Sequence, residues 1–298
     1  MLQIVWNIQR HSRVIALRKS AAKLFGTRLK MWVGLCLGAF LVCAAAAMNM
    51  PARPQDTSPK ALPAALPGGM TRIVDLSYAI NDKLVAWPGD ERVFEAKPNA
   101  TLEKDGYFTR SFWMLEHYGT HLDAPVHFPP GKTTVDRISA EKLLGPAVVI
   151  DVQAESAKDA DYRLTVERIA RWEKQHGTIP AHAIVLLSTG WSSRWPEAAK
   201  YRNQDAAGKM HFPGFSLEAA TLLIERGVNG LGCDTLSIDY GASGDFPVHH
   251  AVLGADLYQL ENLASLNALP EKGAYLIVAP IKLEGGSGGP VRVFALLP

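Results

Sequence analysis

Cysteine is scarce in this sequence, with three residues in a chain of 298. Two of them, Cys36 and Cys43, lie in the first 50 residues, so Cys233 is the single thiol of the remainder. A disulfide within residues 70–298 is therefore excluded, and a zinc site built from several cysteines lacks its ligands. A lone cysteine among apolar residues is typical of the interior, and we expect Cys233 to be buried.

The motifs of phosphate-binding loops are also missing. The chain has no G-x-x-x-x-G-K sequence and no G-x-G-x-x-G after a strand, so nucleotide binding has no support. The segment STGW (188–191) lacks the G-x-S-x-G pattern of a nucleophile elbow, which disfavours a serine hydrolase.

The chain after residue 70 has no excess of basic over acidic residues. The formal net charge of +2 includes nine lysines and arginines and one acid that precede residue 71. The rest of the chain has 22 basic and 28 acidic residues, a net charge of −6. Nucleic-acid binding therefore loses its electrostatic basis, and we expect no nucleic-acid partner.

The first 50 residues have the pattern of a targeting segment. Seven lysines and arginines without an acid lie in residues 1–30, an apolar run follows in 32–48, and Ala44–Ala47 supply small residues. This pattern predicts an export signal and a periplasmic protein, with an inner-membrane anchor or a misassigned start as alternatives. Residues 51–69 are proline-rich and predict a linker, which leaves residues 70–298 as one domain.

Within that domain, strand-like and helix-like segments alternate. Four short apolar segments predict buried strands: 147–152, 183–190, 228–234 and 274–283. Residues 164–177 predict a helix with Thr165 as N-cap, and 216–227 predict another with Ser216 as N-cap. The pattern indicates an α/β fold, a compact mixed β-sheet with flanking helices.

The segment HYGTHLDAPVHF (117–128) concentrates metal-binding side chains. A glycine and a proline exclude an interior helix, and the preceding SFWML is strand-like. In an extended chain His117, His121 and Asp123 would project to one face, with His127 in the same phase. Gly119 would leave room for an ion between the histidines. Imidazole and carboxylate ligands suit Zn²⁺, Mn²⁺ or Fe²⁺.

A second cluster could complete the coordination shell. His249 and His250 open a short helix that Gly254 ends, and a strand containing Glu261 follows. A carboxylate in a buried strand needs a partner because an unpaired buried charge is costly. A metal ion, a salt bridge or a group of backbone N–H donors would each serve.

The order of these motifs resembles the cyclase family of metal-dependent hydrolases, which includes kynurenine formamidases and isatin hydrolases. Besides the histidine segment, the blocks that carry the resemblance are DLSYAIND (75–82), WPGD (87–90), GCDTLSID (232–239), the His249/Glu261 pair and GGSGGPVRVFAL (285–296). The resemblance spans residues 72–298, and the last block is closest to the isatin-hydrolase branch.

The resemblance implies a swivelling β/β/α-like fold, a homodimer or homotetramer, and one or two divalent ions, Zn²⁺ or Mn²⁺. The residues that would hold the metal are His117, His121, Asp123, His249 and Glu261. His127 would transfer protons, and Trp87, in an early loop, would bind substrate by lining a neighbouring subunit's pocket.

The expected activity is hydrolysis of a small amide or lactam, such as an arylformamide or an isatin-like ring, by metal-activated water. A lactone hydrolase or cyclase of the same family is the alternative enzyme. Formylkynurenine breakdown is normally cytoplasmic, so a predicted exported protein favours a lactam from outside the cell. A non-catalytic periplasmic metal-binding protein, or a membrane-tethered interaction domain with a structural metal, is the non-enzymatic alternative. Both would close the coordination shell that a catalyst keeps open.

Overall fold

The computed structural model describes residues 69–298. The predicted leader and most of the predicted linker lie outside these residues, so the predicted domain boundaries stay predictions. Among residues 69–298, no helix has the length and apolarity needed to cross a membrane.

Twelve strands and six α-helices make up the described part of the chain. The strands are β1 (Arg72–Asp75), β2 (Phe94–Ala100), β3 (Thr109–Met114), β4 (His121–Asp123), β5 (Leu144–Asp151), β6 (Arg163–Leu164), β7 (Ile184–Ser188), β8 (Gly214–Phe215), β9 (Gly230–Cys233), β10 (Tyr258–Glu261), β11 (Lys272–Pro280) and β12 (Gly288–Leu297). The helices are α3 (Leu102–Asp105), α4 (Gln153–Ser156), α5 (Val166–His176), α6 (Ala198–Arg202), α7 (Leu217–Glu225) and α8 (Pro247–Gly254).

Eight strands form one mixed sheet in the order β1-β12-β11-β5-β7-β9-β10-β4. β5, β7, β9 and β10 are parallel neighbours, whereas the remaining pairings are antiparallel. The long β12 also pairs with β4, through Gly288–Pro290, so the sheet closes on itself like a small barrel. The predicted α/β fold with a mixed sheet is confirmed.

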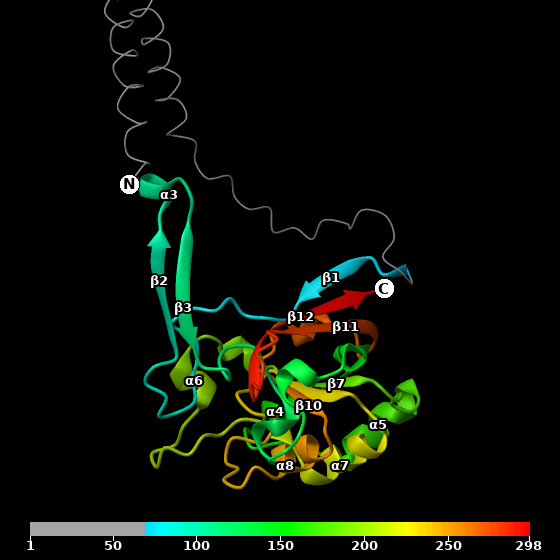
Figure 1. The fold of residues 1–298 in the computed structure, drawn as a ribbon. Coiled ribbons are helices and arrows are strands. Elements are labelled where there is room, and N and C mark those ends of the chain that lie inside the picture. Colours follow the sequence, from blue (N-terminus) through cyan, green and yellow to red (C-terminus); the bar gives the residue numbers. More distant parts are fainter. Residues whose placement is uncertain (1–68) are drawn as a thin grey trace, which may run out of the picture. The chain divides into compact units, whose positions relative to one another are not determined.

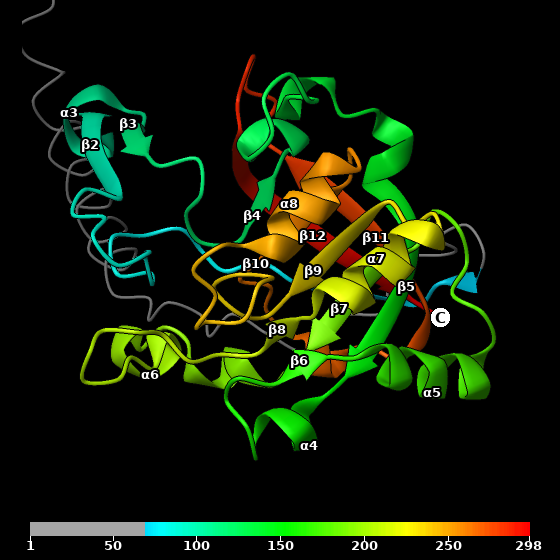
Figure 2. The same ribbon diagram turned by 90° about the horizontal axis from the view of Figure 1, so that it is seen from below.

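The central strands are buried on both faces, which explains their continuous apolar sequences. On β5, Val149 faces a core inside the closed sheet, while Ile150 faces a second core beneath the helices. Figure 2 shows α5, α7 and α8 lying over this outer face, and their buried apolar residues, apart from Leu253 of α8, belong to the second core. Cys233 is fully buried there, as predicted.

The two predicted helices begin where their capping residues predict. The Thr165 side chain accepts a hydrogen bond from the backbone N–H of Arg168 at the start of α5, and Ser216 accepts one from Ala219 in α7. The four predicted strands correspond to β5, β7, β9 and β11. Each of these segments is fixed by local patterning and by burial of its apolar residues.

Candidate metal centre

Two neighbouring strands supply the centre of the site. β4 pairs antiparallel with β10, and the register places His121 opposite Glu261. The intervening residues Leu122 and Leu260 belong to the inner core. Because side chains alternate along a strand, His121, Asp123 and Glu261 project from the other face.

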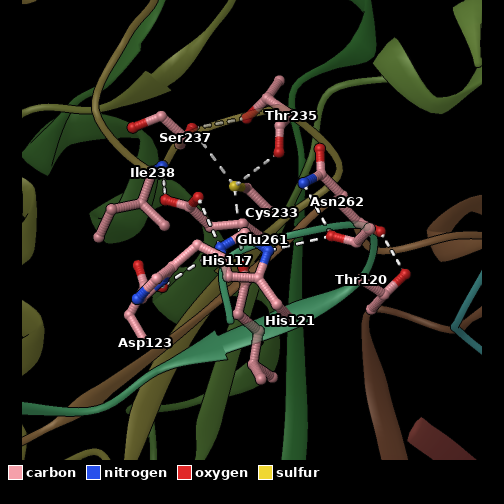
Figure 3. A network of polar contacts seen from close by, with 12 residues as sticks. His117, Thr120, His121, Asp123, Cys233, Thr235, Ser237, Ile238, Glu261 and Asn262 are labelled. Atoms are coloured by element: carbon pink, nitrogen blue, oxygen red, sulfur yellow. Dashed lines mark hydrogen bonds and ion pairs between the residues drawn. The ribbon is translucent and has the colours of Figure 1, made fainter. Parts of the chain in front are cut away.

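Helix α8 brings His249 to the same point. His249 Nε2 lies 3.5 Å from Asp123 Oδ2 and 3.3 Å from Glu261 Oε1. His121 Nε2 lies 3.2 Å from Asp123 Oδ1 and 3.4 Å from Glu261 Oε2. All four side chains are buried, and Figure 3 shows those of His121, Asp123 and Glu261 converging. The Glu261 carboxylate therefore faces two histidines, and its Oε1 also accepts the backbone N–H of Ile238 at 3.0 Å.

His117 and His127 complete the group from the other side of Asp123. His117 Nδ1 lies 2.6 Å from Asp123 Oδ1, and the His127 ring stacks on the His117 ring with centroids 3.9 Å apart. Two sets of side chains come close enough to hold an ion: His121 with Asp123 and Glu261, and His117 with Asp123 and His127. The geometry therefore permits His127 to act as a ligand or as a proton carrier.

The route by which these residues meet differs from the prediction. The chain is extended over His121–Asp123 alone, because Gly119 adopts φ +69° and His127 lies in a 3₁₀ turn, Pro125–His127. A Cβ on Gly119 would meet the Leu84 side chain at 3.0 Å. The absence of a side chain therefore allows both the positive φ and the close approach of Leu84. The prediction of one extended face from His117 onward, with room for an ion at Gly119, is wrong.

In each histidine proposed as a ligand, the ring nitrogen that faces away from the carboxylate cluster has a hydrogen-bond partner. The pairs are His117 Nε2 with Ser287 Oγ at 2.9 Å, His121 Nδ1 with the Gly119 carbonyl at 3.0 Å, and His249 Nδ1 with Asp239 Oδ2 at 2.6 Å. Carbonyls and carboxylates only accept hydrogen bonds, so Nδ1 of His121 and of His249 donates. Such outer partners orient the histidines of metal sites.

This arrangement requires a positive charge between the side chains. In neutral His121 and His249 the Nε2 lone pairs face the carboxylates of Asp123 and Glu261. The lone pairs and the carboxylate oxygens repel each other unless a cation or protons lie between them. Asp123 Oδ2 is buried and has no hydrogen-bond partner. Nitrogen and oxygen donors in this number fit a divalent ion such as Zn²⁺ or Mn²⁺.

The pKa values show how strongly the carboxylates attract positive charge. Burial disfavours the imidazolium of His121, but Asp123 and Glu261 outweigh burial and raise its pKa to about 9. Burial is likewise outweighed at His249, whose pKa is raised well above its usual value by Asp123, Asp239 and Glu261. Burial and three neighbouring histidines lower the pKa of His127 to about 4, so its ring is neutral at pH 7 and can accept a proton.

We predict that metal binding releases about two protons at pH 7. His121 and His249 carry protons on the metal-free protein at this pH, and a metal ligand must be deprotonated. Metal affinity should therefore fall by roughly 100-fold for each pH unit lost below 7, tenfold per displaced proton. Calorimetry in buffers of different ionisation enthalpy measures the released protons, and binding without release would contradict the assignment.

Asp239 is a polar residue whose role the sequence did not indicate. Its carboxylate accepts the backbone N–H groups of Val248 and His249 and the Nδ1–H of His249. It therefore holds the first turn of α8 and the histidine together. In the sequence, Asp239 is marked only as the last residue of the GCDTLSID block.

We predict that Asp239→Asn weakens metal binding by about 10–100-fold, the usual cost of losing an outer partner. The matched control is Asp161→Asn, which removes a carboxylate from the surface histidine His211, at 2.8 Å. Competition with a chelating dye measures both affinities. If the Asp239→Asn protein binds metal as tightly as the control, Asp239 does not support the metal site.

Two further contacts were not foreseen. Glu116 Oε2 accepts hydrogen bonds from Ser287 Oγ at 2.7 Å and from the Ser287 backbone N–H at 2.8 Å, which leaves the hydroxyl oxygen to accept from His117 Nε2. Asn262 Nδ2 donates to the Gly119 carbonyl at 3.0 Å, the same carbonyl that holds His121 (Figure 3). No local pattern marks these residues, because each contact joins distant segments.

A pocket of about 280 Å³ opens beside the cluster. Its aromatic wall contains Trp87, Phe128 and Phe246, with Trp87 and Phe246 centroids 6.0 Å apart. Trp87 therefore lines the pocket of its own chain, and a contribution to a neighbouring subunit's pocket remains a prediction. His250 is exposed and packs against Phe128, outside the cluster.

An α/β domain that directs three histidines and two carboxylates toward one pocket is typical of metal-dependent enzymes. The Cyclase family model matches residues 74–240, a range that contains His117 to His127 and ends before His249 and Glu261. An isatin hydrolase of Roseibium aggregatum is 38% identical over 206 residues, covering 66% of this chain and 78% of the relative. The chain therefore belongs to the Cyclase family.

Other comparisons agree. A kynurenine formamidase of Salinibacter ruber is 30% identical over 226 residues, covering 74% of this chain and 95% of the relative. The structure of isatin hydrolase A from Labrenzia aggregata, bound to benzyl benzoate, is 38% identical with a TM-score of 0.71, covering 76% of this chain and 93% of that one. A structure from Bacillus stearothermophilus described as a predicted metal-dependent hydrolase is 25% identical with a TM-score of 0.58, covering 75% and 97%.

Proposed function

We propose that this protein is a metal-dependent hydrolase that cleaves the amide bond of a small aryl or cyclic amide, such as an isatin-like lactam or an arylformamide. The observation that carries the proposal is the convergence of three oriented histidines and two carboxylates on an aromatic-walled pocket. The names of the isatin hydrolase and kynurenine formamidase relatives support this substrate class.

We assign the metal ligands to His117, His121, Asp123, His249 and Glu261. A divalent metal held there would supply an acidified water and polarise the substrate carbonyl. Zn²⁺ and Mn²⁺ suit the donors, and each of the two carboxylates faces more than one histidine, so the set could hold one or two ions.

The protein's own groups orient the substrate and move the proton. Trp87, Phe128 and Phe246 offer flat apolar surfaces against which an aromatic ring can pack. We assign the proton transfer to His127, which lies at the pocket wall near Asp123 and would accept a proton from the attacking water and return it to the leaving nitrogen.

The test is a hydrolase screen of the purified, metal-loaded protein on isatin, formylkynurenine and simple lactones. We expect turnover of an amide or lactam, loss of activity with EDTA, and recovery with Zn²⁺ or Mn²⁺. Preference for lactones would change the substrate class. Full turnover by protein that elemental analysis shows to be metal-free would exclude the mechanism.

We also propose that the domain works outside the cytoplasm, in the periplasm or anchored to the inner membrane. The positively charged leader and its apolar run support this location. An alkaline phosphatase fusion after residue 70 should be active, and an inactive fusion would count against export. Mass spectrometry of the mature N-terminus separates cleavage near Ala47 from an uncleaved anchor.

A further inference from the structure

An acidic residue of the pocket wall belongs neither to the proposed metal ligands nor to the proposed proton carrier. Asp90 lines the pocket together with Trp87, and both lie in the segment that connects β1 to β2. The described residues of the wall include no lysine or arginine, so no basic side chain of the pocket balances the charge of Asp90. Asp90 therefore gives the pocket a negative charge that a ligand must match or avoid.

The segment that carries Asp90 is held in place by the rest of the domain. Val85 is buried, and Nε of Arg202, the last residue of α6, donates to the Ala86 carbonyl at 2.8 Å. Figure 1 shows the segment passing beside α6 before the chain enters β2. The backbone N–H of Asp90 donates to the Trp87 carbonyl at 3.2 Å and closes a turn. The place of Asp90 in the wall is thus set by the fold of its own chain.

The Asp90 carboxylate is available to a ligand. Within residues 69–298 it takes part in no side-chain hydrogen bond and no ion pair, and the residue is exposed. The nearest basic residue in the sequence, Arg92, pairs instead with Glu95 at 2.8 Å and lies over the ring of Trp113. A ligand therefore has to displace only water from the carboxylate.

The aromatic side chains of the wall favour a ligand of positive charge as well. The ring centroids of Trp87 and Phe246 are 6.0 Å apart, and those of Phe128 and Phe246 are 5.8 Å apart. The face of an aromatic ring carries negative charge density and attracts cations. A cationic group in this part of the pocket would be attracted by ring faces and by Asp90, whereas an anionic group would be repelled by both.

We propose that Asp90 makes the pocket selective for aryl amides whose ring carries a positively charged substituent, such as an ammonium group, and against those that carry a carboxylate or sulfonate. The inference rests on the proposed function for the reaction and adds the charge of the substrate. Asp90 binds the substituent and takes no part in breaking the amide bond. Its contact is equal in the ground state and the transition state, so it lowers KM and leaves kcat unchanged.

The test measures the binding of three probes that share one ring and differ in charge: benzylammonium, benzyl alcohol and phenylmethanesulfonate. Titration calorimetry on the metal-loaded, full-length protein requires no turnover. Asp90→Asn should weaken benzylammonium binding by roughly fivefold, the upper end of what an exposed ion pair contributes. The same variant should strengthen sulfonate binding by a similar factor and leave benzyl alcohol binding unchanged. Any contact of the sulfonate with the metal is common to both proteins and cancels in the comparison.

Glu91→Gln is the matched control, because Glu91 is exposed in the same segment and does not line the pocket. The control should bind all three probes as wild type does. Added salt should reduce the difference between wild type and Asp90→Asn, since salt screens exposed charges. An equal change for all three probes in Asp90→Asn, the same shifts in Glu91→Gln, or a wild type that binds none of the probes would overturn the proposal.

A kinetic comparison separates this proposal from the proposed function. The substrates are formanilide and its para-aminomethyl and para-carboxylate derivatives. Asp90→Asn should raise KM for the aminomethyl derivative by about fivefold, with kcat unchanged. If no amide is cleaved while the probes show the expected charge preference, the proposed reaction is wrong and the selection by Asp90 stands. If the amides are cleaved and neither probes nor KM respond to the charge at Asp90, the proposed reaction stands and the selection by Asp90 is wrong.

Discussion

His121→Asn is expected to remove bound metal and activity together. The His121 imidazole is buried and lies within 3.4 Å of both carboxylates, so its loss removes a nitrogen donor at the centre of the cluster. An asparagine cannot supply the same nitrogen ligand. Metal affinity should fall by more than the roughly 100-fold that an outer partner can cost, and turnover should fall in proportion to metal content.

The measurement combines elemental analysis with kcat on the substrate found in the screen. His211→Asn is the matched control, because His211 also pairs with an aspartate but lies at the surface away from the pocket. The control should keep its metal and its activity. A His121→Asn protein with wild-type metal content would exclude His121 as a ligand.

His127→Asn is expected to keep its metal and lose turnover. Proton transfer by a positioned side chain contributes about 10²–10⁴-fold in rate, so kcat should fall by this factor. Metal content should stay close to that of wild type, because the five side chains proposed as ligands are unchanged in this variant. The pair His121→Asn and His127→Asn therefore separates ligand from proton carrier.

Two other outcomes have definite meanings. If His127→Asn loses metal as His121→Asn does, the set of His117, Asp123 and His127 is a true ligand set and the role assigned to His127 is wrong. If metal and full activity both remain, the proton carrier lies elsewhere, and the exposed His250 is the next residue to replace.

A non-catalytic metal-binding protein predicts a different result from the enzyme. Such a protein has no use for a neutral histidine beside an open pocket, and His127→Asn would leave every measured property unchanged. The aromatic wall of Trp87, Phe128 and Phe246 also has no function in metal storage. Membership of the Cyclase family and the hydrolase relatives favour the enzyme.

The sequence by itself determined the elements that depend on local patterning. The apolar strands β5, β7, β9 and β11 and the caps of α5 and α7 lie where the sequence places them, because burial and capping act within a few residues. The histidine and aspartate residues of the site were identifiable because several metal-binding side chains lie close together in the sequence. Their roles as ligands remain predictions.

Only the tertiary structure decided how those residues meet. The left-handed turn at Gly119 and the short β4 bring His117 to Asp123 by a path that side-chain alternation does not describe. The contacts of Ser287 with Glu116 and of Asn262 with Gly119 join residues 171 and 143 positions apart, which the sheet closed by β4, β10 and β12 brings together. Hydrogen bonds between distant segments leave no periodic signal in a sequence, because their geometry is set by the packing of whole strands and helices.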